Sequence, residues 1–186
     1  MYDIRPLDPK VWRGYLLDFT YTSDFYYDVK LVGNINCFRV TFEKKPFEQT
    51  FINRNVTNDR LFQPYWDDII AYGMVENGTL IGVAETCVES WSNRLRVTEM
   101  WVDAAHRRMG LGRSLMDAVK ERAVREKRRA VILETQSCNA GAIAFYLSQG
   151  FTLIGFDACC YTNTDLARRE VRMEMGYFPG KAQGQS

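Results

Sequence analysis

The fold is decided by the stretch Arg107-Arg108-Met109-Gly110-Leu111-Gly112-Arg113-Ser114. It follows an alternating segment typical of a strand and precedes a segment whose apolar residues recur at helical spacing. Gly110 and Gly112 let the backbone turn sharply and approach a ligand closely, so that successive N–H groups can converge on one point. The positive end of the following helix and three arginines favour an anion there. The stretch therefore predicts a diphosphate cradle, and a plain turn with solvated arginines is the alternative.

Two other phosphate-binding loops can be tested against the same residues. A P-loop needs a lysine followed by Ser or Thr after its second glycine, and a dinucleotide-binding turn needs a third glycine after an early strand. The stretch Gly110-Leu111-Gly112 lacks both features and comes late in the chain. A general nucleotide-binding protein is therefore disfavoured.

The segments on either side of the cradle alternate between strand and helix patterns. Upstream, Asn77-Gly78 supplies the residues of a type I′ turn, so residues 69–75 and 79–88 are expected to form a hairpin. A turn at 90–93 then leads into a strand at 94–102 and completes an antiparallel meander. The other expected elements are a helix from Gly110 to about Arg128, a strand at 130–136, a helix capped by Asn139 and ending at Gly150, a strand at 151–157, a loop or short helix at 162–169 and an edge strand at 171–178.

This order predicts a mixed sheet of the α/β class with an α+β-like meander. The first 68 residues are aromatic and irregular, with one strand-like run at 38–42 that ends near Pro46. With no repeat, low-complexity tract or linker in evidence, residues 1–180 are expected to form a single domain, followed by a frayed tail at 181–186.

Composition excludes several classes of function. The 186 residues include 24 Lys and Arg and 23 Asp and Glu, and a net charge of +1 gives no global field for nucleic acid or a membrane surface. A basic run at 125–129 is expected to be a solvated helix end. Five cysteines without C-x-x-C spacing and a single histidine, His106, argue against a metal site and a disulfide framework. The charged N-terminus and the lack of a long apolar run predict a cytoplasmic protein.

The pattern resembles the GNAT superfamily of acetyl-CoA-dependent N-acetyltransferases. Its signature, R/Q-x-x-G-x-G/A between a strand and a helix, is met by Arg107, Gly110 and Gly112. The likeness extends from about Ile69 to Asp157, and it includes Glu99-Met100-Trp101-Val102 upstream and Asn139, Ala142, Phe145-Tyr146 and Gly150-Phe151 downstream. The resemblance implies a GNAT-type, mostly antiparallel central sheet of six to seven strands with helices on both faces.

Within this superfamily, the chain resembles one subgroup, the streptothricin acetyltransferases. This likeness rests on Leu133-Glu134-Thr135-Gln136, Asn139, the Phe145-Tyr146 pair and Tyr161-Thr162-Asn163. It implies transfer of an acetyl group from acetyl-CoA to a primary amine of a small molecule, such as an aminoglycoside-like or streptothricin-type antibiotic. A protein or peptide amine as acceptor stays open, as do a homodimer and a non-catalytic CoA-binding module.

The resemblance also implies residue roles. Glu99 is the expected base for the acceptor ammonium, Glu134 is its reserve, and Tyr146 is the acid for the leaving thiolate. A bulge would free the N–H of Val102 to polarise the thioester carbonyl. The residues expected to bind acetyl-CoA are Met100, Trp101, Val102, Arg107, Arg108, Met109, Gly110, Leu111, Gly112, Arg113, Ser114, Asn139, Ala142 and Tyr146.

The acceptor should be recognised by an aromatic and acidic surface, because both aromatic faces and carboxylates attract a cation. Trp66, Asp67, Asp68 and Trp91 offer such groups, and the same residues could equally be parts of the core and of loops.

Overall fold

A computed structural model describes residues 3–53 and 59–180. The chain forms two compact units, which are treated separately below. The first unit comprises residues 1–19, 55–133 and 177–186, and the second comprises residues 20–54 and 134–176. The tail expected at 181–186 lies outside the described residues, and a single domain over 1–180 stays a prediction.

Seven strands form a mixed sheet in the order β1-β4-β5-β6-β7-β9-β8, and β2 and β3 form a separate two-stranded sheet. The pairs β1–β4, β4–β5, β5–β6 and β8–β9 are antiparallel, and β6–β7 is parallel, as the predicted fold class requires. The strands are β1 (Arg5–Pro6), β2 (Tyr21–Asn34), β3 (Cys37–Asn53), β4 (Ile70–Glu76), β5 (Thr79–Glu89), β6 (Arg94–Val102), β7 (Ala130–Gln136), β8 (Thr152–Asp157) and β9 (Arg172–Tyr177). The α-helices are α1 (Pro9–Trp12), α2 (Leu111–Arg125), α3 (Ala140–Ser148) and α4 (Asp165–Arg168), with 3₁₀ turns η1 (Ser90–Ser92) and η2 (Ala104–His106).

The meander of the first unit confirms the predicted hairpin. Glu76 pairs with Thr79, and the two turn residues between them take positive φ, 50° at Asn77 and 80° at Gly78. This is the geometry that a type I′ turn demands and that Asn-Gly adopts at little cost. The turn expected at 90–93 is η1, which is closed by Asn93 in a left-handed conformation.

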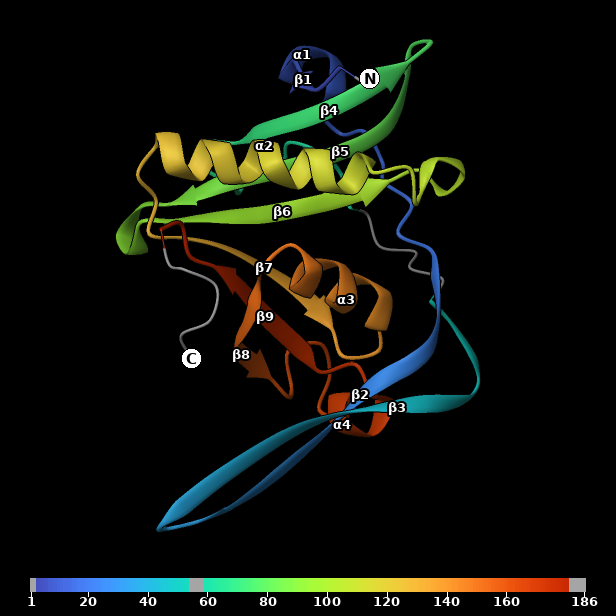
Figure 1. The fold of residues 1–186 in the computed structure, drawn as a ribbon, viewed down its shortest axis with the longest axis vertical. Helices are drawn as coiled ribbons and strands as arrows, with labels where there is room; N and C mark the ends of the chain where they lie inside the picture. Colours follow the sequence, from blue (N-terminus) through green and yellow to red (C-terminus); the bar gives the residue numbers. More distant parts are fainter. Residues whose placement is uncertain (1–2, 54–58, 181–186) are drawn as a thin grey trace. The chain divides into compact units, whose positions relative to one another are not determined.

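Helix α2 lies along β5 and β6 in the first unit (Figure 1). Its buried side chains include Leu111, Leu115 and Val119, which recur at the spacing of one helical face. The helix ends at Arg125 rather than near Arg128, because the chain turns back through a left-handed Lys127 with φ of 54°. Helix α2 can pack closely on the strands because Gly82 leaves room for Leu115.

The other face of the meander carries a second apolar cluster. It joins the N-terminal segment to the sheet through the buried residues Leu7, Leu17, Leu61, Phe62, Ala71, Leu80 and Val83, with Trp101 packed against them. Strand β1 pairs with β4 in the same region. The N-terminal segment thus shapes the face of β5 and β6 that lies opposite α2.

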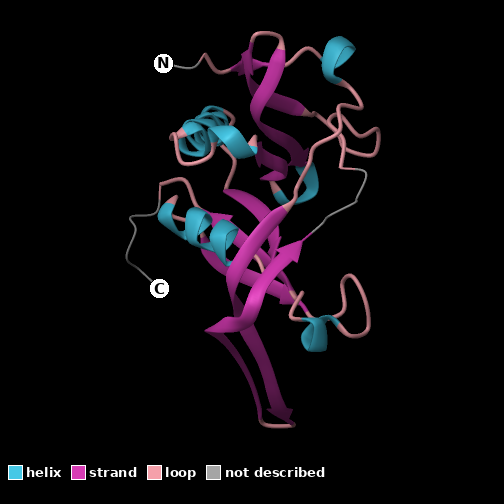
Figure 2. Cartoon of the chain, turned by 90° about the vertical axis from the view of Figure 1, so that its right-hand side faces the viewer, coloured by secondary structure: helices cyan, strands magenta, loops and turns pink. Residues whose placement is uncertain are grey.

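The second unit differs from the sequence prediction in its first part. Strands β2 and β3 pair over most of their length and form a long twisted ribbon (Figure 2). The run expected at 38–42 therefore belongs to a strand that passes Pro46 and continues to Asn53. Pro46 is tolerated because it lies opposite Phe25, next to a register shift where the hydrogen-bond ladder is already interrupted.

One further expectation for the second unit is wrong. The strand expected at the edge is β9, which lies between β7 and β8, so the edge strand is β8. Strand β9 returns antiparallel to β8 and so separates β8 from β7. Cys159 and Cys160 are exposed in the bend after β8.

None of the helices in the described residues is both long enough and apolar enough to span a membrane.

Candidate functional site

The expected diphosphate cradle forms the turn between β6 and α2 in the first unit. Asp103 caps η2 by accepting hydrogen bonds from the N–H of Ala105 (3.0 Å) and from the His106 ring (2.7 Å). Arg107 Nε donates to the carbonyl of Val102 (3.2 Å), which ties the turn to the end of β6. The chain then passes through two left-handed residues, Arg108 with φ of 65° and Gly110 with φ of 88°.

Three backbone N–H groups at this turn lie ahead of the helical ladder. The first hydrogen bond of α2 runs from the N–H of Ser114 to the carbonyl of Gly110 (3.2 Å). The N–H groups of residues 111–113 therefore have no partner within the helix. Among the described residues, 3–53 and 59–180, no acceptor is hydrogen-bonded to them either. A side chain at Gly110 would meet no atom within 4 Å, so the turn borders open space. Converging donors beside the positive end of a 15-residue helix fit a diphosphate.

Strand β6 is paired to different extents on its two edges. Within residues 3–53 and 59–180, its ladder with β7 covers Arg94, Leu95 and Arg96, whereas its ladder with β5 continues to Val102. Met100 and Val102 therefore lie on a stretch of strand that can accept an added extended segment, as expected for pantetheine. The bulge expected to free the N–H of Val102 lies instead at Thr98, and Val102 itself pairs with Gly82.

Glu99, the expected base, lies directly across from Glu85 in the β5–β6 ladder. Residues paired in this way point to the same face of a sheet, with Cβ atoms about 5 Å apart. Burial raises the pKa of Tyr65, and the charges of Glu99, Asp59 and Glu85 raise it further. Tyr65 therefore lies close enough to Glu99 and Glu85 for their charges to affect its hydroxyl. In the sequence it directly precedes Trp66, the first of the expected acceptor residues.

Glu85 is a residue that the sequence analysis missed. Its side chain is 0% exposed, and it accepts hydrogen bonds from the N–H of Phe62 (2.7 Å) and the hydroxyl of Thr98 (2.9 Å). Burial raises its pKa, while these two hydrogen bonds and the charge of Arg13 act in the opposite direction. The sequence does contain a sign of this role, because a single acidic residue in the middle of the mostly apolar strand β5 must find hydrogen-bond partners when it is buried.

The expected acceptor residues lie in two places of the first unit. Trp66, Asp67 and Asp68 form one segment that is held through its backbone: Asp67 O accepts from the N–H of Val88 (3.3 Å), and Asp68 O accepts from Arg122 (3.2 Å). Trp91 lies in η1 with 84% of its surface exposed, and its ring contacts the guanidinium of Arg94 at 5.4 Å. The contacts of Trp91 thus run to Arg94 rather than to the other three residues.

A pocket of about 340 Å³ adjoins Asp68, and Arg122, Glu126 and Arg128 are among its lining residues. Arg122 and Arg128 both bind the carboxylate of Glu126, at 2.8 and 2.9 Å. Glu126 is therefore neutralised by two guanidinium groups, whose positive charge makes this pocket a poor place for a cationic acceptor.

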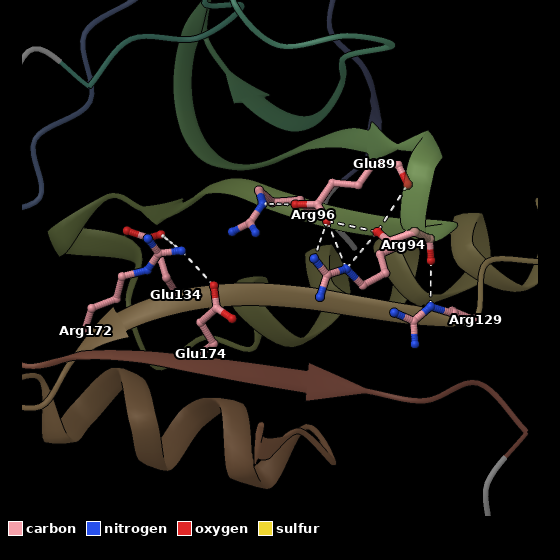
Figure 3. Close-up of polar contacts among 8 residues, drawn as sticks. Glu89, Arg94, Arg96, Arg129, Glu134, Arg172 and Glu174 are labelled. Atoms are coloured by element: carbon pink, nitrogen blue, oxygen red, sulfur yellow. Dashed lines mark hydrogen bonds and ion pairs between the residues drawn. The ribbon is translucent and has the colours of Figure 1, made fainter. Parts of the chain in front are cut away.

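The β5–β6 turn is braced by an ion-pair cluster (Figure 3). Glu89 accepts from Arg94 and Arg96 at 2.6 Å each. Burial opposes ionisation of Glu89, but these hydrogen bonds prevail and lower its pKa. Arg129 Nε donates to Ser92 O (2.6 Å), which ties the turn to the start of β7. This cluster fixes the end of β6 that is distant in sequence from the cradle.

The remaining expected residues belong to the second unit. Asn139 caps α3 by accepting from the N–H of Ala142 (3.1 Å), which confirms the predicted cap. Tyr146 is buried on α3, with its ring against those of Phe145 (5.4 Å) and Phe151 (6.0 Å).

Glu134, the reserve base, is paired with a cation. Its carboxylate lies 3.0 Å from Arg172, which also contacts Glu174 at 2.7 Å (Figure 3). The carboxylate of Glu134 is therefore held in place by an ion pair within the second unit.

In the described part of the chain, no group of three or more His, Cys, Asp or Glu side chains is arranged to hold a metal ion. His106, the single histidine, is instead engaged by Asp103 and lies 3.6 Å from Glu76.

Comparisons with known proteins agree with this geometry. The model of the Acetyltransferase (GNAT) family matches residues 35–151, which is more than half of the chain. A streptothricin acetyltransferase from Streptomyces lavendulae is 26% identical over 162 residues, covering 86% of this chain and 85% of the relative.

Two solved structures share the fold over nearly the whole chain. A nourseothricin acetyltransferase superposes with a TM-score of 0.75 at 25% identity, covering 95% of this chain and 98% of the other. A protein from Bacillus anthracis, solved in complex with acetyl coenzyme A, superposes with a TM-score of 0.70 at 23% identity, covering 96% and 97%. With the family model matched across the cradle and the central strands, the chain belongs to the GNAT family of acetyltransferases.

Proposed function

We propose that this protein acetylates a primary amine of a streptothricin-type antibiotic, with acetyl-CoA as the acetyl donor. The observation that carries the proposal is the cradle at residues 107–114, where unbonded N–H groups and a helix N-terminus meet beside the open edge of β6. The choice of acceptor is supported by the relatives that act on streptothricin and nourseothricin by name.

When bound, acetyl-CoA supplies a thioester whose carbonyl carbon an amine can attack. The N–H groups of residues 111–113 hold its diphosphate, and Arg107, Arg108 and Arg113 add positive charge around it. Met100 and Val102 pair with the pantetheine amides along the β6 edge. These contacts would fix the reacting group relative to β6, and such orientation favours attack by the amine.

Glu99 accepts the proton of the acceptor ammonium, either directly or through water, because only the neutral amine is a nucleophile. Val102 lies opposite Gly82, but the N–H of the next residue, Asp103, bonds to Ile81 O on the β5 side, so the N–H of Val102 points to the other edge of β6, where it donates to the developing oxyanion. As the C–N bond forms and the C–S bond breaks, Tyr146 donates its hydroxyl proton to the leaving thiolate, a role assigned by the family resemblance. The second proton lost by the attacking nitrogen replaces it on the phenolate through solvent. The transfer is direct, and none of the five cysteines carries the acetyl group.

Thiol release from acetyl-CoA at pH 8 tests the proposal. The amine panel comprises nourseothricin, an aminoglycoside, spermidine and a peptide with a free N-terminal amine. The proposal predicts the largest kcat/KM with nourseothricin and a mass increase of one acetyl group on that compound. A larger kcat/KM with the peptide would shift the assignment to a protein or peptide acetyltransferase, and no release with any amine would leave a non-catalytic CoA-binding module.

A further inference from the structure

Glu85 occupies an unusual position for an acidic residue. It lies in the middle of β5 with its side chain fully buried, and its neighbours Ala84 and Thr86 are buried too. Burying a carboxylate costs free energy, and an apolar residue of similar size would usually stabilise such a site more. Two directed hydrogen bonds compensate for this cost, and both reach segments that the proposed function depends on.

The first hydrogen bond holds the bulge in β6. In the β5–β6 ladder Glu85 pairs with Glu99 and Thr86 pairs with Val97, so Thr98 is the extra residue. A regular ladder continued from Val97 would place Thr98 opposite Glu85 and Glu99 opposite Ala84, on the other face of the sheet. The hydroxyl of Thr98 donates to Glu85 Oε1 (2.9 Å) and so fixes the register that keeps Glu99 on the face of Tyr65 and Trp101.

The second hydrogen bond holds the start of the acceptor segment. Phe62 has a left-handed backbone with φ of 59°, which is uncommon for a residue with a bulky side chain. Its N–H donates to Glu85 Oε2 (2.7 Å), and its carbonyl accepts from Arg13 (3.0 Å). Both backbone groups of Phe62 are therefore fixed, which sets the direction of the chain into Tyr65 and Trp66.

We propose that Glu85 is a positioning residue for acetyl transfer: its two hydrogen bonds hold Glu99 and the segment from Phe62 to Asp68 in one arrangement. This inference rests on the proposed function, in which Glu99 is the base and that segment contacts the acceptor. Glu85 is itself fully buried, so it acts through Thr98 and Phe62 and not by touching the acceptor.

Steady-state kinetics of Thr98→Val, Thr98→Ser, Glu85→Gln and Glu85→Ala test the inference. Valine matches the shape of threonine but cannot donate to Glu85, so Thr98→Val should lower kcat about tenfold or more while the KM for acetyl-CoA stays within about twofold. Serine keeps the hydroxyl of residue 98. Glutamine at position 85 can accept from the N–H of Phe62 through its carbonyl oxygen and donate from its amide N–H to the hydroxyl of Thr98, so both variants should retain kcat within about threefold. Glu85→Ala should resemble Thr98→Val.

Cys87→Ala is the matched control for a general loss of stability. Cys87 is buried on β5, two residues from Glu85, and it takes no part in the hydrogen bonds of Glu85. At equal fractions folded by circular dichroism, Thr98→Val should lose far more kcat than Cys87→Ala. Equal kcat in these two variants, or an equal loss in Glu85→Gln and Glu85→Ala, would overturn the positioning role. Absence of transfer by the wild-type protein would instead count against the proposed function.

Discussion

Glu99 of β6 lies directly opposite Glu85 of β5, and the hydroxyl of Thr98 reaches Glu85 from the bulge beside them. Two carboxylates on neighbouring strands and one face repel each other when both are ionised. In the proposed function, a cationic acceptor placed beside Glu99 would relieve that repulsion before it loses its proton, so this face of the first unit is expected to attract ammonium groups.

Replacing Glu99 with glutamine tests its role as the proton acceptor. Glu99→Gln keeps the size and polarity of the side chain but removes its basicity, so kcat should fall by about 10²-fold or more while acetyl-CoA binding is retained. Calorimetric titration with acetyl-CoA and the thiol-release assay check the two parts. Glu121→Gln, at an exposed position on α2, should leave both unchanged. Full activity of Glu99→Gln would return the role of base to Glu134 or to water.

Replacing Gly110 with alanine tests the cradle. A Cβ there meets no atom within 4 Å, so the variant should fold, but the φ of 88° strains any other residue by about 1 kcal/mol and shifts the N–H groups around it. We expect weaker acetyl-CoA binding by about tenfold. Gly78→Ala is a close control, because Gly78 has a φ of 80° and equally open space but lies in the β4–β5 turn. Equal affinities of the two variants would exclude a cradle at Gly110.

Replacing Tyr146 with phenylalanine tests the proposed acid. The ring of Tyr146 packs against Phe145 and Phe151, and phenylalanine preserves that packing while removing the hydroxyl. Turnover should fall about tenfold or more, with little change in the dissociation constant of acetyl-CoA. Tyr72→Phe, which loses only an exposed contact with Arg125, serves as the control. Unchanged turnover in Tyr146→Phe would leave the residue a purely structural role.

The pair of Asp103 and His106 predicts a pH dependence of stability. The hydrogen bond that the His106 ring donates to the carboxylate of Asp103 raises the pKa of His106 and outweighs the opposing effect of burial, with the charges of Asp103 and Glu76 contributing further. Because the folded pKa exceeds that of the unfolded chain, the stabilisation is fully present below about pH 6.5 and is lost as the pH rises through the folded pKa. Urea unfolding from pH 5 to 9 should show this decline in the wild type. The decline should be smaller in His106→Gln, and identical profiles would contradict the assignment.

The turns and helix starts that are determined by a few neighbouring residues could be predicted from the sequence. Asn77-Gly78 specified the β4–β5 turn, and Asn139 specified the start of α3, since each acts within a few residues. The glycines and arginines of residues 107–114 predicted the turn before α2 for the same reason.

Pairings between distant segments were less accessible from the sequence. Strand β9 lies between β7 and β8 although it follows both in the chain, so its place depends on pairings between segments that are distant in sequence. The role of Glu85 was also hidden, because its partners Phe62 and Thr98 are 23 and 13 residues away and only the folded ladder brings them to one carboxylate.

The central claim is that the turn before α2 holds the diphosphate of acetyl-CoA, and a crystal structure of the protein with CoA tests it most directly. We expect diphosphate oxygens within hydrogen-bonding distance, about 3 Å, of the N–H groups of residues 111–113. A diphosphate bound at any other surface, with these N–H groups facing only solvent, would contradict it.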